Sequence, residues 1–302
     1  MTWPIVPDDV IDWIQHVVSE ANDAATERLT NQPNVRETSL DDALINGIEK
    51  YSAPKRLPSG AVVMLEVHNI GGLRQIERWE LADIAFIVHV TVEGRPLSRK
   101  IGLLQSKRLY PTNSDVDVDD PLTFKLGLNG LLDAEVGRAF SQLRRDYSFK
   151  DSSRFGAIVS DDPQLARIKE FHKRFGEAVF YLLYAPVEVP LDVRMPTSAY
   201  RKVLRAVEGA RVVRAAAIEK AVKRAGSTRG GPTLKSVKRN AGAEYWRLED
   251  WASNLLLRCK VGRQYTEADI DLINGVVVRR SGPIGAAIRI NIDLPEALEE
   301  QS

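Results

Sequence analysis

The chain has 302 residues, 44% of them hydrophobic and 27% charged, which is a globular composition with enough length for one large or two modest domains. The net charge of +1 gives no overall basic excess of the kind that marks many nucleic-acid-binding proteins. The single cysteine, Cys259, excludes a disulfide framework and a multi-cysteine zinc site. No apolar run approaches the length of a membrane span, and the N-terminus lacks the regions of a secretory signal. We therefore expect a cytoplasmic protein without membrane contact.

Charge is distributed unevenly along the chain. Residues 1–50 contain ten acidic and three basic side chains, whereas residues 201–240 contain two acidic and twelve basic ones. Such asymmetry can mark a face that binds a polyanion, but a solvated helix with its loop is the commoner reason for a run of charge.

Two helices are predicted at the start of the chain. Residues 8–28 carry apolar side chains at helical spacing, and a second helix is expected from about Ser39, capped by Thr38 or Ser39. Glu37 lies just before that start. Its carboxylate can either reach a site beside a sheet or favour the positive end of the helix dipole, and the sequence does not decide between them.

Three strands are predicted next. Residues 61–68 (AVVMLEVH), 83–90 (DIAFIVHV) and 100–107 (KIGLLQSK) are each rich in β-branched and apolar side chains. Residues 93–96 (EGRP) have turn chemistry, so the last two strands are expected to form a β-hairpin. His89 is interpreted as a satisfied core histidine rather than a general base.

The hairpin brings three polar side chains together. If it folds symmetrically about Gly94 and Arg95, Asp83 lies opposite position 106. Gln105 and Lys107 flank that position and, being two residues apart, point to one face. A carboxylate, an amide oxygen and an ammonium group thus gather at one end of an otherwise apolar hairpin, where polar groups need partners.

Further elements are predicted towards the C-terminus. They comprise helices at 131–146 and 162–176, a strand at 178–184, a long basic helix at 198–224, a helix near 248–259, and strands near 276–278 and 286–292.

The pattern of Asp83, a hairpin and Gln105-Ser106-Lys107 resembles the signature of the PD-(D/E)xK nuclease superfamily, which has the restriction-endonuclease-like fold. It is similar in particular to the Mrr-like and phage-defence-associated members, some of which carry Gln-x-Lys. Residues 36–45 resemble the first core helix with its acidic residue, Glu37. Two residues depart from the pattern: Ala82 replaces a proline, and Gln105 replaces an acid.

The resemblance implies a fold and a site. The fold class is α/β: a restriction-endonuclease-like core at 35–190, with a helical segment at 1–34 and an α+β accessory region at 191–302. Asp83, Gln105 and Glu37 would hold Mg²⁺ or Mn²⁺, because hard cations prefer oxygen ligands. Lys107 would position or deprotonate the attacking water, and Glu80 would be an accessory acid.

Two other interpretations of these residues stay open. Asp83 and Lys107 can be an ordinary cross-strand ion pair, worth under about 1 kcal/mol when exposed. The chain can also be a degenerate nuclease that only binds DNA or assists assembly, which the loss of charge at Gln105 favours.

The resemblance further implies DNA as substrate, a role in bacterial anti-phage defence, and an ATPase or helicase as partner, since this chain has no ATPase motif of its own. Homo-oligomerisation is possible. Phosphate contacts are expected from basic side chains in two regions. The first surrounds the predicted site and comprises Arg95, Arg99, Lys100 and Arg108. The second lies along the predicted long basic helix and comprises Arg201, Lys202, Arg205, Arg211, Arg214, Lys220, Lys223 and Arg224.

Overall fold

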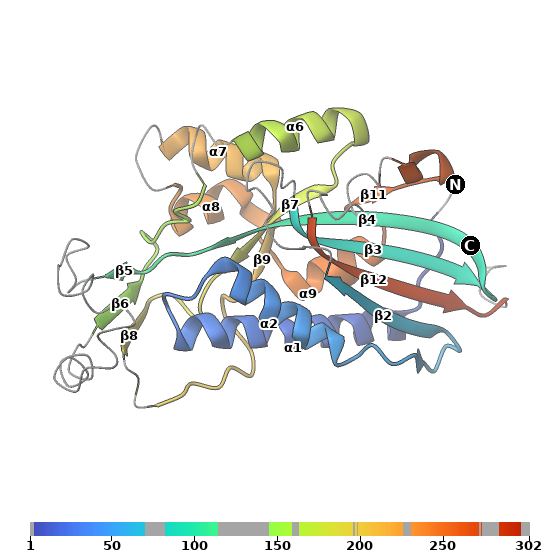
Figure 1. Ribbon diagram of the computed structural model, residues 1–302, viewed down its shortest axis with the longest axis horizontal. Helices are drawn as coiled ribbons and strands as arrows, with labels where there is room; N and C mark the ends of the chain where they lie inside the picture. The colour runs from blue at the N-terminus through green and yellow to red at the C-terminus, as the bar shows by residue number, and fades with distance from the viewer. Residues whose placement is uncertain are drawn as a thin grey trace, which may run out of the picture.

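A computed structural model of the chain describes residues 3–69, 82–113, 145–158, 163–195, 197, 199–225, 231–271, 273 and 284–296. It is a mixed α/β protein with a large mixed sheet flanked by helices, as the fold class predicts at that level (Figure 1). The strand order in the large sheet is β1-β2-β12-β3-β4-β7-β9-β10, and β11 pairs with β4.

The strands of this sheet are β1 (Lys55–Arg56), β2 (Val62–Asn69), β3 (Ala82–Val92), β4 (Arg95–Arg108), β7 (Val179–Tyr184), β9 (Arg211–Arg214), β10 (Trp246–Arg247), β11 (Arg263–Gln264) and β12 (Ile284–Leu294). A smaller sheet has the order β5-β6-β8, formed by β5 (Thr112–Asn113), β6 (Arg145–Phe149) and β8 (Leu191–Met195). The predicted helix at 131–146 lies mostly outside the described residues, and its last two positions begin β6.

The helices are α1 (Asp8–Asn31), α2 (Glu37–Glu49), α6 (Pro163–Phe175), α7 (Ala215–Ala225), α8 (Leu234–Ala241) and α9 (Leu248–Asp250), and the last continues as a π-helix through Trp251–Leu257. Figure 1 shows α1 and α2 along one face of the sheet and α6 and α7 on the opposite side. Helix α2 begins at Glu37, with Arg36 before it and no side-chain cap, so the expected capping by Thr38 or Ser39 is wrong. Within the described part of the chain, no helix combines the length and apolar character that crossing a lipid bilayer requires.

Strand β12 lies between β2 and β3, antiparallel to the first and parallel to the second. Its side chains Ile288, Ile290 and Ile292 are each 1% exposed. The strand comes from the region that the sequence analysis treats as accessory. The large sheet therefore extends across the boundary expected at residue 190.

The β3–β4 hairpin has a different register from the predicted one. Ile84 lies opposite Leu104, and continuing this register places Asp83 opposite Gln105 rather than position 106. The turn residues are Glu93 and Gly94, with φ of 48° and 76°, which is typical of a type I′ turn. The predicted centre at Gly94 and Arg95 was wrong because the turn lies one residue earlier, and a bulge after Val90 shifts the pairing again.

The predicted long basic helix at 198–224 is not formed. Residues 199–210 are irregular, β9 follows, and only α7 is helical. Gly209 has φ of 65°, a conformation that helices exclude. Val212 and Val213 are buried in the sheet, where β-branched side chains pack well. Tertiary packing thus outweighs the helical spacing of the basic residues.

Candidate functional site

The carboxylate of Asp83 lies at the start of β3, where the end of β4 presents two donors to it. The backbone N–H of Ser106 donates to Oδ2 over 2.7 Å, and the side-chain amide of Gln105 donates to the same oxygen. The observed register explains this contact, because residues directly opposite in an antiparallel pair point to one face. The predicted proximity of Asp83 and Gln105 is therefore present, through a register different from the predicted one.

Glu37 reaches the same strand end from the first turn of α2. Its Oε1 accepts the backbone N–H of Arg108 over 3.1 Å, and its Oε2 lies 3.8 Å from Nζ of Lys107. Both positions that the sequence leaves open for this carboxylate are therefore observed, since it lies in the first turn of the helix and also reaches the sheet. The guanidinium of Arg108 donates to the carbonyl of Pro33 over 2.8 Å, which fixes the loop that leads into α2.

Two residues that sequence reasoning did not select complete the cluster. Asp41, one helical turn after Glu37, is 8% exposed, and its Oδ1 accepts the Ser106 hydroxyl over 2.6 Å and the Tyr184 hydroxyl over 2.8 Å. Ser106 points away from Gln105 and Lys107, towards α2, because side chains alternate along a strand. The spacing of Glu37 and Asp41 on one helix face was the available signal. No sequence pattern pointed to Tyr184, because it is the last residue of a strand that is otherwise apolar.

Negative charge accumulates at this strand end. Burial raises the pKa of the Asp41 carboxyl well above its ordinary value, and the neighbouring carboxylates of Asp83 and Glu37 raise it further. Burial and the carboxylate of Asp41 likewise raise the pKa of the Tyr184 hydroxyl. The ammonium group of Lys107 and its ion pair with Glu37 lie at the same place. A cation bound here would reduce the mutual repulsion of the carboxylates.

The oxygen atoms that the resemblance assigns to a metal are of the kind that a hard divalent cation binds. They are carboxylate oxygens of Asp83 and Glu37, the amide oxygen of Gln105 and the carbonyl of Ser106. Within the described ranges, no group of three or more His, Cys, Asp or Glu side chains is arranged to hold a metal ion. Any ion would therefore depend on the amide and backbone oxygens as well as the acids. Glu80, the expected accessory acid, lies outside the described residues.

Basic side chains near the hairpin are more dispersed than expected. Arg95 lies beside the turn, roughly 30 Å from Asp83 at about 3.3 Å per residue along the strand. Arg99, near the same end, pairs with Glu267 over 2.6 Å. Lys100 is 1% exposed, with its ammonium 5.3 Å from the centre of the Trp3 ring. The expectation that these three side chains surround Asp83 was wrong because the hairpin is long; only Arg108 lies at the cluster.

The second basic group is divided among three elements. Arg201, Lys202 and Arg205 lie on the irregular segment, while Lys220, Lys223 and Arg224 lie on α7. On β9, Arg214 pairs with Glu177 and Glu244, and Arg211 lies over the Tyr245 ring. These side chains do not line one helix, and the β9 arginines already have partners within the protein.

Comparison of the chain with protein-family models, with curated proteins and with solved structures finds no match.

Proposed function

We propose that this protein is a metal-dependent nuclease that hydrolyses phosphodiester bonds of DNA. The observation that carries the proposal is the meeting of Glu37, Asp83, Gln105 and Lys107 at one end of the β3–β4 hairpin. An isolated cross-strand ion pair would bring Asp83 and Lys107 together without recruiting a carboxylate from a helix. The buried state of Lys107, with 9% of its side chain exposed, also differs from an ordinary surface pair.

The order of elements supports the proposal. Helix α2, strand β2, hairpin β3–β4, helix α6 and strand β7 follow one another in the order of the nuclease core that the Asp and Gln-x-Lys pattern resembles. Strand β7 lies parallel to β4 and antiparallel pairing joins β3 to β4. The start of α2, the start of β3 and the end of β4 lie together, so the residues with proposed roles come from three elements.

Each side chain has a role in the proposed reaction. Asp83, Gln105 and Glu37 would hold Mg²⁺ or Mn²⁺, which supplies charge stabilisation at the phosphate and acidifies its water. The ammonium of Lys107 would offset phosphate charge and hold the attacking water. The N–H donors from Gln105 and Ser106 both bind Oδ2 of Asp83 and so fix the orientation of its carboxylate.

Cleavage of supercoiled plasmid and linear duplex in Mg²⁺ or Mn²⁺ tests the proposal. We expect Asp83→Ala and Lys107→Ala to reduce cleavage by about 100-fold or more, because each removes a group that acts on the reacting atoms. Asp42→Ala, an exposed acid on α2, and Lys55→Ala, an exposed base on β1, serve as matched controls and should cleave like wild type. Equal cleavage by wild type and both site variants would refute the assignment of this site.

A second function is favoured by one contact. The side-chain N–H of Gln105 donates to Asp83, so the negative charge and the second oxygen that an acid would offer at this position are absent. A nuclease fold that binds DNA or assists assembly without cleaving it would tolerate this. Salt-sensitive DNA binding without cleavage, together with no Mn²⁺ binding by wild-type protein, would favour this second function.

The biological setting rests on the resemblance alone. We propose that the protein acts in bacterial anti-phage defence beside an ATPase or helicase subunit. Reconstitution with a candidate motor protein, and plaque counts with and without Lys107→Ala, would test that setting.

A further inference from the structure

An irregular segment at residues 199–207 is fixed against α1 by side chains of that helix. Asn31 accepts the backbone N–H of Arg201 and donates to its carbonyl, both over 2.8 Å. Glu27 accepts the N–H of Val203 over 2.9 Å, and Asp23 accepts that of Ala206 over 3.1 Å. The three helix residues are four apart, so one helix face holds the backbone of the segment along its length.

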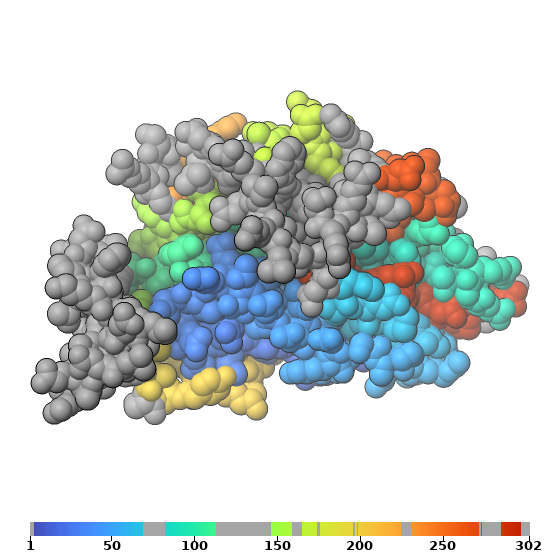
Figure 2. Space-filling model, viewed as in Figure 1, coloured from blue at the N-terminus to red at the C-terminus, as the bar shows by residue number. Residues whose placement is uncertain are grey.

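The segment presents apolar side chains to solvent. Tyr200, Leu204 and Val207 are 70%, 78% and 69% exposed, whereas Val203 and Ala206 are buried against the helix. Figure 2 shows this part of the chain, in yellow, on the surface beside α1 in blue. The hydrogen bonds to α1 thus hold the backbone of the segment in one arrangement, with Leu204 and Val207 exposed and the Tyr200 hydroxyl donating to the Glu27 carboxylate. Folding alone does not require apolar side chains at these positions, because side chains that remain exposed add no buried area to the core.

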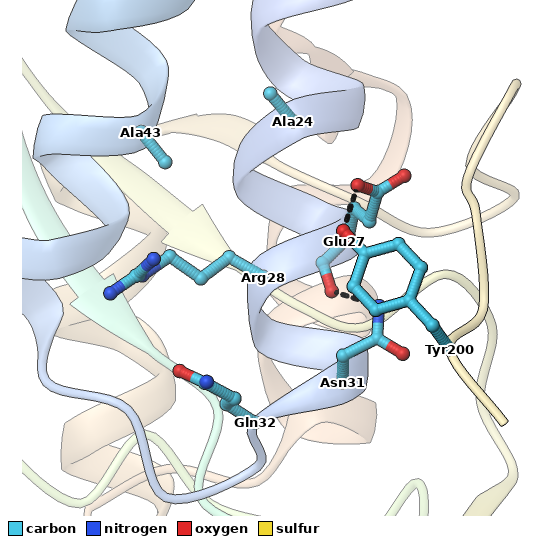
Figure 3. Close-up of a pocket in the computed structure, with 7 residues that line it drawn as sticks. All are labelled: Ala24, Glu27, Arg28, Asn31, Gln32, Ala43 and Tyr200. Atoms are coloured by element: carbon cyan, nitrogen blue, oxygen red, sulfur yellow. Dashed lines mark hydrogen bonds between the residues drawn. The ribbon is translucent and has the colours of Figure 1, made fainter. Parts of the chain in front are cut away.

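Positive charge and a cleft accompany these side chains. Lys202 and Arg205 on the segment, and Arg28 on α1, have no hydrogen bond or ion pair from their side chains within the described part of the chain. Arg28 and Tyr200 line a cleft of about 190 Å³ together with Glu27, whose carboxylate accepts the Tyr200 hydroxyl and the backbone N–H of Val203. Figure 3 shows the Arg28 guanidinium extending towards α2 beside Gln32 and Ala43, with the Tyr200 ring next to Glu27 and Asn31.

We propose that this surface, formed by Tyr200, Lys202, Leu204, Arg205, Val207 and the Arg28 cleft, docks an acidic amphipathic segment of a partner protein. Its carboxylates would pair with Arg28, Lys202 and Arg205, and its apolar side chains would cover Tyr200, Leu204 and Val207. Tyr and Arg side chains are enriched among the residues that dominate protein interfaces, and a backbone that is already ordered lowers the entropic cost of binding.

The features of the surface favour a protein over other partners. Nucleic acid phosphates would use the three cations and leave Leu204 and Val207 exposed. A lipid surface has no side chain to insert into the cleft. A basic peptide would be repelled by the cations, so the occupant is acidic.

Selection from a displayed library of random peptides tests this surface. The full chain is the bait, and Tyr200→Ser/Leu204→Ser/Val207→Ser is the counter-selection bait. Synthetic versions of the selected peptides are then measured by fluorescence anisotropy against wild type, the apolar triple variant, and Arg28→Glu/Lys202→Glu/Arg205→Glu. Ile5→Ser is the matched control, because Ile5 is 62% exposed and lies on another part of the chain. Circular dichroism checks that all variants fold.

We expect peptides that combine Asp or Glu with large apolar residues. Their affinity should fall by about tenfold or more in both triple variants and stay unchanged in Ile5→Ser. Peptides without acids, or peptides that bind the variants as well as wild type, would overturn the proposal. Binding of a DNA duplex or of anionic vesicles that both triple variants abolish would also overturn it. So would a wild-type dimer in sedimentation that the same substitutions dissociate.

Discussion

Asp41 shows how much a single buried carboxyl group can determine. It accepts hydrogen bonds from Ser106 and Tyr184, and so joins α2 to the ends of β4 and β7. Ser106 stands between Gln105 and Lys107, so its hydroxyl contact fixes the backbone that carries both of them. Through these two contacts Asp41 holds the strand end in place.

We expect Asp41→Ala to lower the free energy of unfolding by about 2–4 kcal/mol, because two buried hydroxyl groups lose their acceptor. Asp41→Asn keeps an oxygen for both hydroxyls and should cost less than about 1 kcal/mol. Urea denaturation followed by circular dichroism measures both. Asp42→Asn, the exposed neighbour, is the control and should change stability by less than about 0.5 kcal/mol. A loss for Asp41→Asn as large as for Asp41→Ala would show that the negative charge, and not the acceptor, stabilises the strand end.

The sequence predicts part of this cluster because the side chains concerned lie on two strands and one helix start with clear patterns. Asp83, Gln105 and Lys107 follow from the period of two along the hairpin, even with the register wrong by one residue. Asp41 and Tyr184 could not be predicted, since their contact joins residues 143 positions apart in different elements. Only tertiary packing brings them together.

At the scale of elements, a glycine in β4 lets a tryptophan side chain pack directly against the strand. A Cβ atom added to Gly102 would lie 2.8 Å from the Trp251 ring, which also contacts Phe86 and Phe180 with ring centres 5.6 and 5.4 Å apart. Trp251 is fully buried. The helix that carries Trp251 can therefore pack onto the middle of the sheet because Gly102 has no side chain.

We expect Gly102→Ala to lower the free energy of unfolding by about 1–3 kcal/mol through overpacking against the ring. Trp251→Phe makes room at that position, so the double variant should be more stable than the sum of the two single changes predicts. A double-mutant cycle in urea gives the coupling. Additive effects would mean that the strand, and not the ring, moves to accommodate the methyl group.

Element types were easier to predict than the relations between elements. The hairpin strands, α6 and the strand at 178–184 have strong local patterns, and each is present within a few residues. The basic stretch at 198–224 has helical spacing over its whole length, yet only its last part is helical. Hydrogen bonds from α1 and pairing of β9 with β7 decide its structure, and neither is visible in local sequence.

At the scale of the whole molecule, His89 joins three distant segments. Its Nε2 lies 2.7 Å from the Tyr265 hydroxyl, and its Nδ1 lies 2.9 Å from a guanidinium nitrogen of Arg289. The predicted role of a satisfied histidine is confirmed, since both ring nitrogens have partners. The contacts connect β3 with β12 and with the chain that follows β11.

The same histidine should make stability depend on pH. Burial, and then the charges of Arg289 and Arg99, lower its pKa from 6.5 to about 4. Between these values the unfolded chain binds more protons than the folded one, so stability is full above pH 6.5 and falls as pH drops towards 4. With allowance for partial exposure, we expect a loss of about 1–2 kcal/mol. His89→Gln should flatten this part of the profile in urea titrations, whereas exposed His16→Gln should leave it unchanged.

The position of β12 makes the C-terminal region part of the core. The strand pairs with β2 on one side and β3 on the other, so its removal would leave an unpaired edge on each of these strands. The apolar side chains that pack against β12 would also lose their contacts. Burial of Ile288, Ile290 and Ile292 alone is worth about 5–9 kcal/mol at 1.5–3 kcal/mol for each side chain. This is comparable to the whole stability of a typical domain, about 5–15 kcal/mol.

We therefore expect a chain that ends at residue 283 to lose cooperative unfolding, while a chain that ends at Glu296 keeps it. Thermal and urea denaturation of both truncations measure this. A synthetic peptide of residues 284–296 should restore cooperative unfolding to the shorter chain when added in excess, because the strand supplies its contacts without a covalent link. If the shorter chain unfolds cooperatively without the peptide, β2 and β3 must pair directly. The hairpin and the cluster at Asp83 would then be able to form without the C-terminal strand.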